Sequence, residues 1–214
     1  PDHLSWDVPS AEVCEFKAKK TKYCFISIIW NEGDRIRRQL MRMAPKAHEA
    51  DIILCDGRSN DVSTYEEFLI QQGVRTILIT DEIGLCTATR LGIAYAMEQG
   101  YEGIVTVDGN GKDGVEAISN FISCLENGYD LIQGSRFLKG GFQENTPIER
   151  YLGVRFVMSP ILSLGAGRKF TDVTNAFRAC SMDYLLDERV QPLRKEFVFS
   201  NLQLYLDYRA AKLI

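Results

Sequence analysis

Residues 23–32, YCFISIIWNE, decide the fold of this chain. Residues 23–30 form a continuous apolar run that is rich in β-branched and aromatic side chains. Such runs are typical of strands buried on both faces of a parallel sheet, because helices cover both faces there. Asn31 and Glu32 follow at once, so the run is predicted to be a buried strand that ends in a polar loop.

The same unit recurs along the chain. Residues 33–43 are helix formers with apolar residues at Ile36, Leu40 and Met43, the spacing of one helical face. Alternation of strand and helix through about residue 135 predicts a largely parallel, three-layer α/β/α sheet. The further strands are predicted at 51–55, 74–79, 103–107 and 130–133, and the further helices at 62–72, 88–99 and 115–127.

The pattern changes after Ser135. A helix is predicted at 148–164, with an interruption near Pro160, because proline cannot continue a helical hydrogen-bond ladder. Residues 1–22 are interpreted as a leader and residues 23–214 as a single domain. Loops are predicted at 139–147 and 165–172, and a mostly helical tail from residue 194 onward.

Composition excludes some classes of protein. A net charge of −4 argues against nucleic-acid binding, which needs a basic face. Apolar runs stay far below the roughly 20 residues of a membrane span, so a cytoplasmic protein, at most peripheral to the inner face of a membrane, is expected. The apolar stripe at 151–164 has two interpretations: a core-facing helix or, less often, a membrane-facing acceptor groove.

The expected ligand site lies at the carboxyl ends of the parallel strands, where loops and helix N-termini converge. The loops predicted there span 30–33, 56–61, 81–84, 108–113 and 134–136, and four of the five carry a carboxylate. Carboxylates gathered at one edge need a cation or a hydrogen-bonding ligand among them. No G-x-G-x-x-G follows the first strand and no P-loop occurs, which leaves a metal or arginines to bind phosphate.

Six segments, in order between about residue 25 and residue 180, resemble motifs of the family-two glycosyltransferases of GT-A fold. The likeness is greatest to the dolichyl- and polyprenyl-phosphate mannose synthase branch. The segments are 30–32 (P-x-x-N-E), 56–61 (D-D-G-S-x-D), 84–96 (G-x-x-x-A-x-x-x-G-x-x-x-A), 108–110 (D-x-D), 134–136 with 140–141 (G-S-R, G-G) and 172–178 (D-x-T-S/N-G-F-R).

The resemblance implies roles for individual residues. The metal is assigned to Asp108 and Asn110, with Asp113 as a further candidate because Asn110 replaces the second acid of D-x-D. Asp172 is the candidate base for a hydroxyl acceptor. Donor contacts are assigned to Trp30, Asn31, Glu32, Asp56, Gly84, Leu85 and Asp108, and phosphate contacts or catalysis to Arg136, Arg150 and Arg178.

The implied activity is transfer of a sugar, with inversion, from GDP-mannose or a UDP-sugar to a polyprenyl phosphate or a glycan, assisted by Mg²⁺ or Mn²⁺. Cell-envelope glycan synthesis and peripheral membrane contact are implied with it. The family's closing E-V-P strand is absent after residues 204–214, as in a truncated chain. Two alternatives stay open: a nucleotide-sugar binding domain with little turnover, suggested by Asn110, and a sugar-phosphate nucleotidyltransferase, whose G-G-x-G-T-R-L segment is missing.

Overall fold

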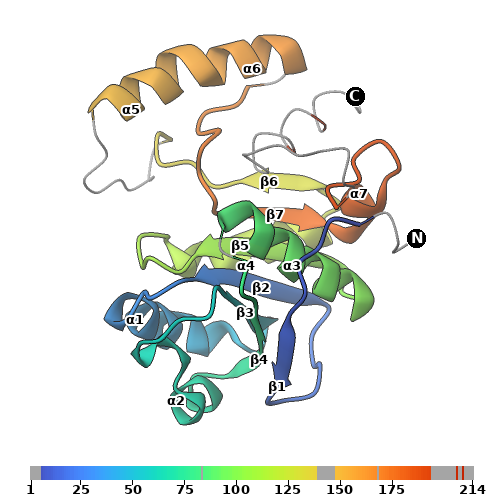
Figure 1. Cartoon of the computed structure of the whole chain (residues 1–214). Coiled ribbons are helices and arrows are strands. Elements are labelled where there is room, and N and C mark those ends of the chain that lie inside the picture. Colours follow the sequence, from blue (N-terminus) through green and yellow to red (C-terminus); the bar gives the residue numbers. More distant parts are fainter. Residues whose placement is uncertain are drawn as a thin grey trace.

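The computed structural model describes residues 6–82, 84–138, 148–167, 169–193, 206 and 209. Within these residues the chain forms a seven-stranded sheet of order β1-β4-β3-β2-β5-β7-β6, with helices on both faces (Figure 1). The strands are β1 (Glu12–Glu15), β2 (Tyr23–Ile29), β3 (Ala50–Asp56), β4 (Val74–Ile79), β5 (Gly103–Asp108), β6 (Leu131–Gln133) and β7 (Arg178–Ser181). The α-helices are α1 (Asp34–Met43), α2 (Glu66–Gln71), α3 (Leu85–Glu98), α4 (Ile118–Glu126), α5 (Ile148–Leu152), α6 (Ser159–Ala166) and α7 (Met182–Leu186).

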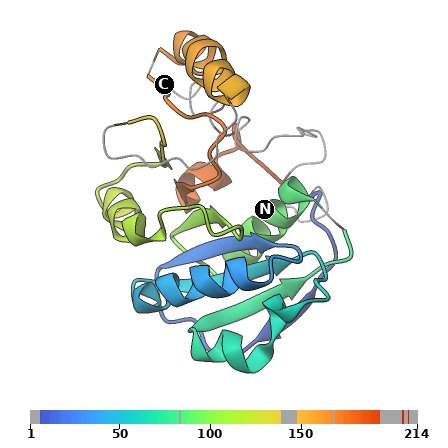
Figure 2. The same cartoon turned by 90° about the vertical axis from the view of Figure 1, so that its left-hand side faces the viewer.

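The centre of the sheet is parallel, as the sequence predicts. β2 pairs in parallel with both β3 and β5, and β3 pairs in parallel with β4. All seven residues of β3 are buried, because helices cover both of its faces. The carboxyl ends of these four strands therefore meet at one edge of the molecule, which Figure 2 faces. This arrangement confirms the mostly parallel α/β/α fold.

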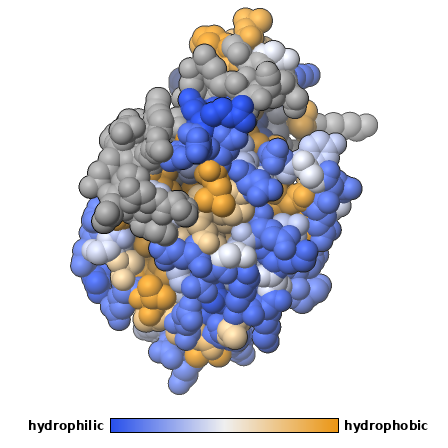
Figure 3. Space-filling model, turned by 90° about the vertical axis from the view of Figure 1, so that its right-hand side faces the viewer, coloured by the Kyte–Doolittle hydropathy of each residue, from blue (hydrophilic) through white to orange (hydrophobic). Residues whose placement is uncertain are grey.

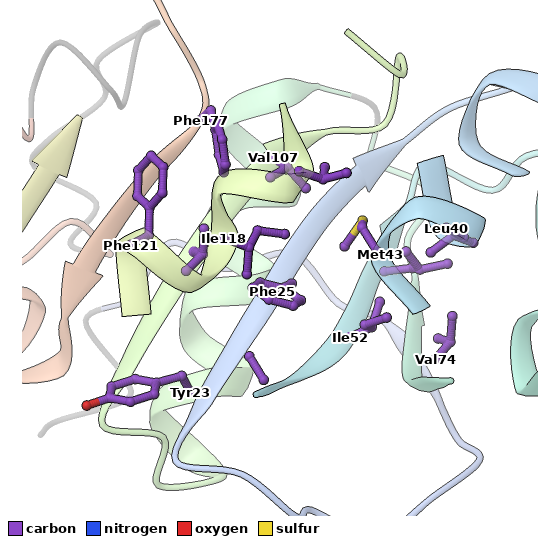
Figure 4. Packing of buried hydrophobic residues seen from close by; sticks show 14 of the residues in the cluster. Tyr23, Phe25, Leu40, Met43, Ile52, Val74, Val107, Ile118, Phe121 and Phe177 are labelled. Atoms are coloured by element: carbon purple, nitrogen blue, oxygen red, sulfur yellow. The ribbon is translucent and has the colours of Figure 1, made fainter. Parts of the chain in front are cut away.

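Two hydrophobic cores lie on opposite faces of the sheet. One is formed under α3 and α7, and the other under α1, α2 and α4. In the second core, Leu40 and Met43 of α1 lie beside Ile52 of β3 (Figure 4). Phe121 of α4 and Phe177 stack with ring centroids 4.3 Å apart. The helical spacing of apolar residues seen in the sequence is thus the spacing that fills these cores.

The outer strands β1, β7 and β6 enter the sheet through antiparallel pairs, which the sequence did not predict. β1 lies within residues 1–22, interpreted from sequence as a leader, and pairs with β4. β7 lies between β5 and β6 and is antiparallel to both, so β6 runs in the same direction as the four central strands but is not paired directly with any of them. The residues of β1 are EVCE and those of β7 are RACS, and neither segment has the apolar run that marks a buried strand.

The helix predicted at 148–164 is present but is divided differently. A π-helical segment, Gly153–Met158, separates α5 from α6, and Pro160 lies in the first turn of α6, where its missing N–H costs nothing. The core interpretation of the apolar stripe is wrong: Phe156 is 62% exposed, Ile161 65% and Leu164 84%. Figures 1 and 2 show α5 and α6 standing away from the sheet. Because these helices do not pack flat against the sheet, many of their apolar side chains are exposed to solvent.

Other parts of the surface are mostly hydrophilic. Figure 3 shows the side of the molecule opposite the carboxyl edge, where hydrophilic residues surround a few hydrophobic groups. No helix in the described residues has both the length and the apolar character needed to cross a bilayer. The six cysteines are free thiols. The loop predicted at 139–147 and almost all of the tail from residue 194 lie outside the described residues.

Candidate active site at the carboxyl edge of the sheet

The loops that follow β2 and β3 are joined by reciprocal hydrogen bonds. The Asn31 N–H donates to Ser59 Oγ at 2.8 Å, and the Asn60 N–H donates to Asn31 Oδ1 at 2.9 Å. Asn31 and Arg58 both have positive φ, 51° and 52°, which is uncommon outside glycine. Asn31, assigned from the sequence to the donor, therefore lies at the carboxyl edge and connects the two loops.

Asp56 faces inward at the end of β3. Its carboxylate is 1% exposed and accepts hydrogen bonds from the Ser59 N–H at 3.0 Å and from Ser59 Oγ at 2.5 Å. Burial raises the pKa of Asp56 above its ordinary value, although the Ser59 hydrogen bonds oppose this shift. Asp56 therefore organises the turn at 56–59, which is the ordinary structural use of aspartate in such loops.

The other residues assigned to the donor surround this turn. The ring of Trp30, 53% exposed, lies over Gly57, where an added Cβ would lie 3.4 Å from Trp30 Cδ1. Glu32 pairs with Arg35 at 3.0 Å. Gly84 and the exposed Leu85 begin α3 at the same edge. These residues come together at the ends of β2, β3 and β4, as predicted.

The loop after β5 brings two carboxylates and one amide together. The Asp108 N–H donates to Asp113 Oδ2 at 2.9 Å, and Asn110 Nδ2 lies 3.5 Å from Asp108 Oδ2. Burial, followed by the charge of Asp108, raises the pKa of Asp113 to about 6. A shift of this kind is typical of carboxylates that are held together for a ligand rather than for stability.

Two residues of α1 hold this loop in place. Gln39, fully buried, accepts from the Gly111 N–H at 2.9 Å and donates to Ser27 Oγ. Arg42 donates to the carbonyl oxygens of Gly111 and Asp113 and forms an ion pair with Glu116 at 2.7 Å. Neither residue is predicted from the sequence, since a glutamine and an arginine on an amphipathic helix look like ordinary surface residues.

The donor atoms of this loop suit a hard divalent cation. Carboxylate and amide oxygens are the ligands that Mg²⁺ and Mn²⁺ prefer. In the part of the chain that is described, no three His, Cys, Asp or Glu side chains form a metal cluster. Asp108, Asp113 and Asn110 would thus hold a cation only in part, and phosphate oxygens of a ligand can supply the rest.

Arg136 and Asp172 form a buried bidentate pair next to this loop. Arg136 Nε and Nη2 each lie 2.7 Å from an oxygen of Asp172, which is 0% exposed, and the Arg136 N–H also donates to Asp172. Hydrogen bonds to Asp172 raise the pKa of Arg136 most, and the charges of Asp172, Asp113 and Asp108 raise it further. Arg136 is therefore oriented by one carboxylate while it lies in the field of two others.

Arg178 lies at the start of β7 and is only 1% exposed. Its guanidinium donates to the carbonyl oxygens of Asn175 at 2.7 Å and Val173 at 3.0 Å. In this structure the side chain supports the loop that carries Asp172. Arg150 belongs to α5, but its side chain is outside the described part of the structure.

The fold is shared with solved structures of a glycosyltransferase. Solved structures of glucosyl-3-phosphoglycerate synthase from Mycobacterium tuberculosis share it, including a complex with Mn²⁺, uridine diphosphate and glucosyl-3-phosphoglycerate (TM-score 0.56, 17% identity, 76% of this chain and 57% of that one). A complex with Mn²⁺, UDP-glucose and phosphoglyceric acid gives a TM-score of 0.57 at 16% identity, over 76% of this chain and 57% of that one. The chain therefore has the GT-A fold of glycosyltransferases. No family model matches it.

Comparison with curated sequences finds relatives of one kind, the polyprenyl- and dolichyl-phosphate mannosyltransferases. Undecaprenyl-phosphate mannosyltransferase of Micrococcus luteus is 26% identical over 159 residues, or 73% of this chain and 65% of the relative. Polyprenol monophosphomannose synthase of Mycolicibacterium smegmatis is 30% identical over 50% of this chain and 40% of its own length. Dolichol-phosphate mannosyltransferase of Pyrococcus furiosus is 27% identical over 77% and 47%. In sequence the chain is thus a relative of polyprenyl- and dolichyl-phosphate mannosyltransferases, and it spans 40–65% of their lengths.

Proposed function

We propose that this chain is a glycosyltransferase domain that moves a sugar from a nucleotide-diphosphate donor to a polyprenyl phosphate. The observation that carries the proposal is the carboxylate pair Asp108 and Asp113 next to Arg136, at the carboxyl edge of the sheet. A cation site beside a guanidinium is what a leaving diphosphate requires, since both neutralise the charge that develops on it.

The donor is a sugar nucleotide. GDP-mannose agrees with the mannosyltransferase names of the sequence relatives, and a UDP-sugar agrees with the ligands of the solved neighbours. Trp30, Asn31 and Leu85 would line the nucleoside, with Asp56 acting through the turn that it organises. Glu32 and Gly84 lie at the same strand ends and remain candidates for contact with the ribose or base.

Asp108, Asp113 and the amide oxygen of Asn110 would hold the cation, Mg²⁺ or Mn²⁺. When bound, the cation supplies positive charge that stabilises the departing nucleoside diphosphate. The protein residues have separate tasks. Arg136, whose Nε and Nη2 are held by Asp172, would offer its Nη1 donors to phosphate oxygens, and Gln39 and Arg42 keep the loop in its shape.

A phosphate acceptor makes a general base unnecessary, because the attacking oxygen is already anionic. Direct displacement at the anomeric carbon, with inversion, then needs only positioning and charge neutralisation. Asp172 is better suited to orienting Arg136 than to abstracting a proton, since both of its oxygens accept hydrogen bonds from Arg136. With a glycan acceptor instead, Asp172 would remain the candidate base. Arg150 and Arg178 stay as candidates for the acceptor phosphate.

The apolar side chains of α5 and α6 support attachment to a membrane that carries the lipid acceptor. Ile148 of α5, Phe156 of the π-helical segment between the two helices, and Ile161 and Leu164 of α6 are all more than 60% exposed, on a helical stretch that stands away from the sheet. Exposed apolar residues on a helix that does not span the bilayer suit the interfacial plane. We place the protein at the cytoplasmic face of that membrane.

A second candidate is a nucleotide-sugar binding domain with little turnover, favoured by Asn110 alone. An amide at this position brings no charge to the cation, which would weaken its binding. Turnover of a radiolabelled sugar nucleotide onto polyprenyl phosphate separates the two candidates, because a binding domain would bind the donor and release it unchanged.

The test of the proposal is a thermal-shift panel of GDP, UDP, CDP and dTDP sugars, each with and without Mn²⁺. A ligand that binds only the folded state raises its apparent stability, so the order of the shifts reports the donor. We expect a metal-dependent shift with one nucleotide family, and its loss in Asp108→Ala. The absence of any nucleotide shift in the native protein, with Mn²⁺ present, would refute the assignment.

A further inference from the structure

Aromatic rings connect the site with the helical stretch 148–166, which comprises α5, the π-helical segment and α6. Phe137, the residue after Arg136, meets the ring of Tyr151 edge-on, with centroids 5.3 Å apart and an interplanar angle of 82°. Tyr151 meets Phe156 in the same way, at 6.5 Å and 81°. Edge-on contacts at these distances are attractive and depend on orientation. A row of three rings therefore runs from the neighbour of Arg136 to a side chain that is 62% exposed.

Two arginines lie against this row. The guanidinium of Arg136 is 5.4 Å from the centroid of the Phe137 ring. The guanidinium of Arg155 is 5.6 Å from the centroid of the Tyr151 ring, and Arg155 Nη1 donates to the Tyr151 hydroxyl oxygen at 2.7 Å. A cation within about 6 Å of a ring face is attracted to it. Tyr151 is thus held from the site by Phe137 and from the exposed stretch by Arg155.

A second link joins α6 to the other half of the ion pair between Arg136 and Asp172. Ser163 Oγ accepts from the Phe170 N–H at 2.8 Å and donates to the Ser159 carbonyl oxygen at 2.6 Å. Phe170 comes two residues before Asp172, and Figure 1 shows the chain passing from α6 down to β7 on this side. The helical stretch is therefore linked to the site at positions one and two residues away from the two members of the ion pair.

Hydrogen bonds join the two loops that carry these links. Thr171 Oγ1 donates to Ser135 Oγ at 2.8 Å, between the residues that precede Arg136 and Asp172. Together with the bidentate contact between Arg136 and Asp172, this bond makes one unit of the two loops. A change in how the helical stretch lies would therefore move this unit and, with it, the guanidinium of Arg136.

A bilayer can fix the position of the helical stretch. Phe156, Ile161 and Leu164 are 62%, 65% and 84% exposed. Burying several large apolar side chains in the interfacial region is more favourable than one contact between rings. A ligand shifts a protein between arrangements only by binding one of them better. A flat apolar surface binds best the arrangement in which these side chains all face it.

We propose that Tyr151 and Ser163 are positioning residues that couple attachment of the helical stretch to a bilayer with the orientation of Arg136, so that membrane binding raises turnover. This inference rests on the proposed function, in which Arg136 binds phosphate and the stretch meets the membrane. Neither residue touches the substrate in this scheme, since each acts through the loop that it contacts. The coupling confines full activity to the surface that carries a lipid acceptor.

The test measures membrane contact separately from the supply of acceptor. Turnover of GDP-mannose and of UDP-glucose with Mn²⁺ is followed onto farnesyl phosphate, with and without phosphatidylcholine vesicles that carry no acceptor. Comparing kcat at saturating farnesyl phosphate removes any effect of its concentration at the vesicle surface. The variants are Tyr151→Ala, which removes the ring contacts, and Ser163→Ala, which removes the acceptor of the Phe170 N–H. Tyr151→Phe keeps the rings and is the matched control.

We expect vesicles to raise the kcat of the native protein and of Tyr151→Phe about tenfold, which corresponds to about 1.4 kcal/mol, the scale of one aromatic contact. In Tyr151→Ala and Ser163→Ala the rise should be less than about twofold. The KM for the donor should stay as in the native protein, and all four proteins should co-sediment equally with the vesicles. A merely structural role would lower stability without removing the response to vesicles.

Turnover of the native protein that is the same with and without vesicles would overturn the inference. Stimulation of an alanine variant to the native degree would overturn the role of that residue. Loss of vesicle binding in Tyr151→Ala would assign Tyr151 to the attachment surface and refute its positioning role. A native protein that shows no turnover in any of these mixtures would instead refute the proposed function, and the inference with it.

Discussion

Burial of Asp113 disfavours its ionised form, whereas the proposed cation site requires that form. Its pKa is raised from 3.8 to about 6, so the folded protein holds this proton more tightly than the unfolded chain does. The stability linked to the proton is complete below about pH 4 and is lost as the pH rises through about 6. At neutral pH the ionised Asp113 therefore destabilises the metal-free fold.

This conflict predicts the effect of Asp113→Asn. The variant keeps an oxygen that can accept from the Asp108 N–H but carries no charge. In EDTA at pH 7.5 its Tm should exceed that of the native protein by a few degrees, since about 1 kcal/mol shifts Tm by roughly 2–4 °C in a chain of this size. The advantage should vanish near pH 4, and the stabilisation by Mn²⁺ should be lost. Thermal unfolding between pH 4 and pH 8 measures both, and parallel curves for the two proteins would contradict the argument.

A substitution of Arg178 tests whether this residue stabilises the loop at 172–175 or binds a ligand. Because its guanidinium is buried on the carbonyl oxygens of Val173 and Asn175, Arg178→Met leaves those acceptors unsatisfied. We expect a loss of roughly 2–3 kcal/mol in the free energy of unfolding. Urea denaturation measures it, with the exposed Arg189→Met as control. Unchanged stability combined with lost turnover would instead favour contact with the acceptor phosphate.

Helix α1 positions the loop that carries the proposed cation site, through Gln39 and Arg42. We predict that Arg42→Ala weakens Mn²⁺ binding by roughly tenfold, the usual effect of removing a residue that orients metal ligands. Calorimetric titration with Mn²⁺ measures the change. Lys46→Ala is the control, because Lys46 binds Glu49 and Ser119 away from this loop. Equal Mn²⁺ affinity in Arg42→Ala and the native protein would show that the loop holds its shape unaided.

The elements differ in how far the sequence predicts them. β2, β3, β4 and β5 agree with the predicted strands to within a residue at each end, because an apolar run between polar loops has few other solutions. The helix predicted at 62–72 instead begins with a 3-10 turn, Val62–Thr64, and becomes α-helical only at Glu66. The strand β7 was missed because its four residues follow a loop and pair only with distant partners, which no local pattern encodes.

The site was predicted to a similar degree. Asp108, Asn110 and Asp113 were assigned together, since all three follow a buried strand in a short polar loop, and they lie together. Whether a side chain faces the ligand or the interior depends on packing, so neither the inward turn of Asp56 nor the burial of Arg178 was visible in the sequence.

Across the whole molecule, the proposed binding sites for nucleoside, diphosphate and acceptor lie in the order of the strands in the sheet. The nucleoside would lie over the ends of β4, β3 and β2, the diphosphate at the loop after β5, and the acceptor phosphate near Arg136. The apolar residues of α5 and α6 stand beyond this last position, at one end of the molecule (Figures 1 and 2). A lipid acceptor bound at its phosphate would then have its chain on the side where α5 and α6 expose apolar residues.

This arrangement predicts that the protein binds lipid vesicles through α6. Ile161 and Leu164 are 65% and 84% exposed, and burying each in the interface contributes about 1.5–3 kcal/mol. The double substitution Ile161→Glu/Leu164→Glu should therefore reduce co-sedimentation with vesicles at least tenfold. Since the net charge is −4, anionic lipid gives little attraction, and binding of the native protein should change little between low and high salt. Val13→Glu, at an equally apolar and half-exposed residue of β1, is the control and should bind as the native protein does. If the double variant retains its fold and binds vesicles as well as the control, α6 is not the attachment surface and its exposed face has another partner.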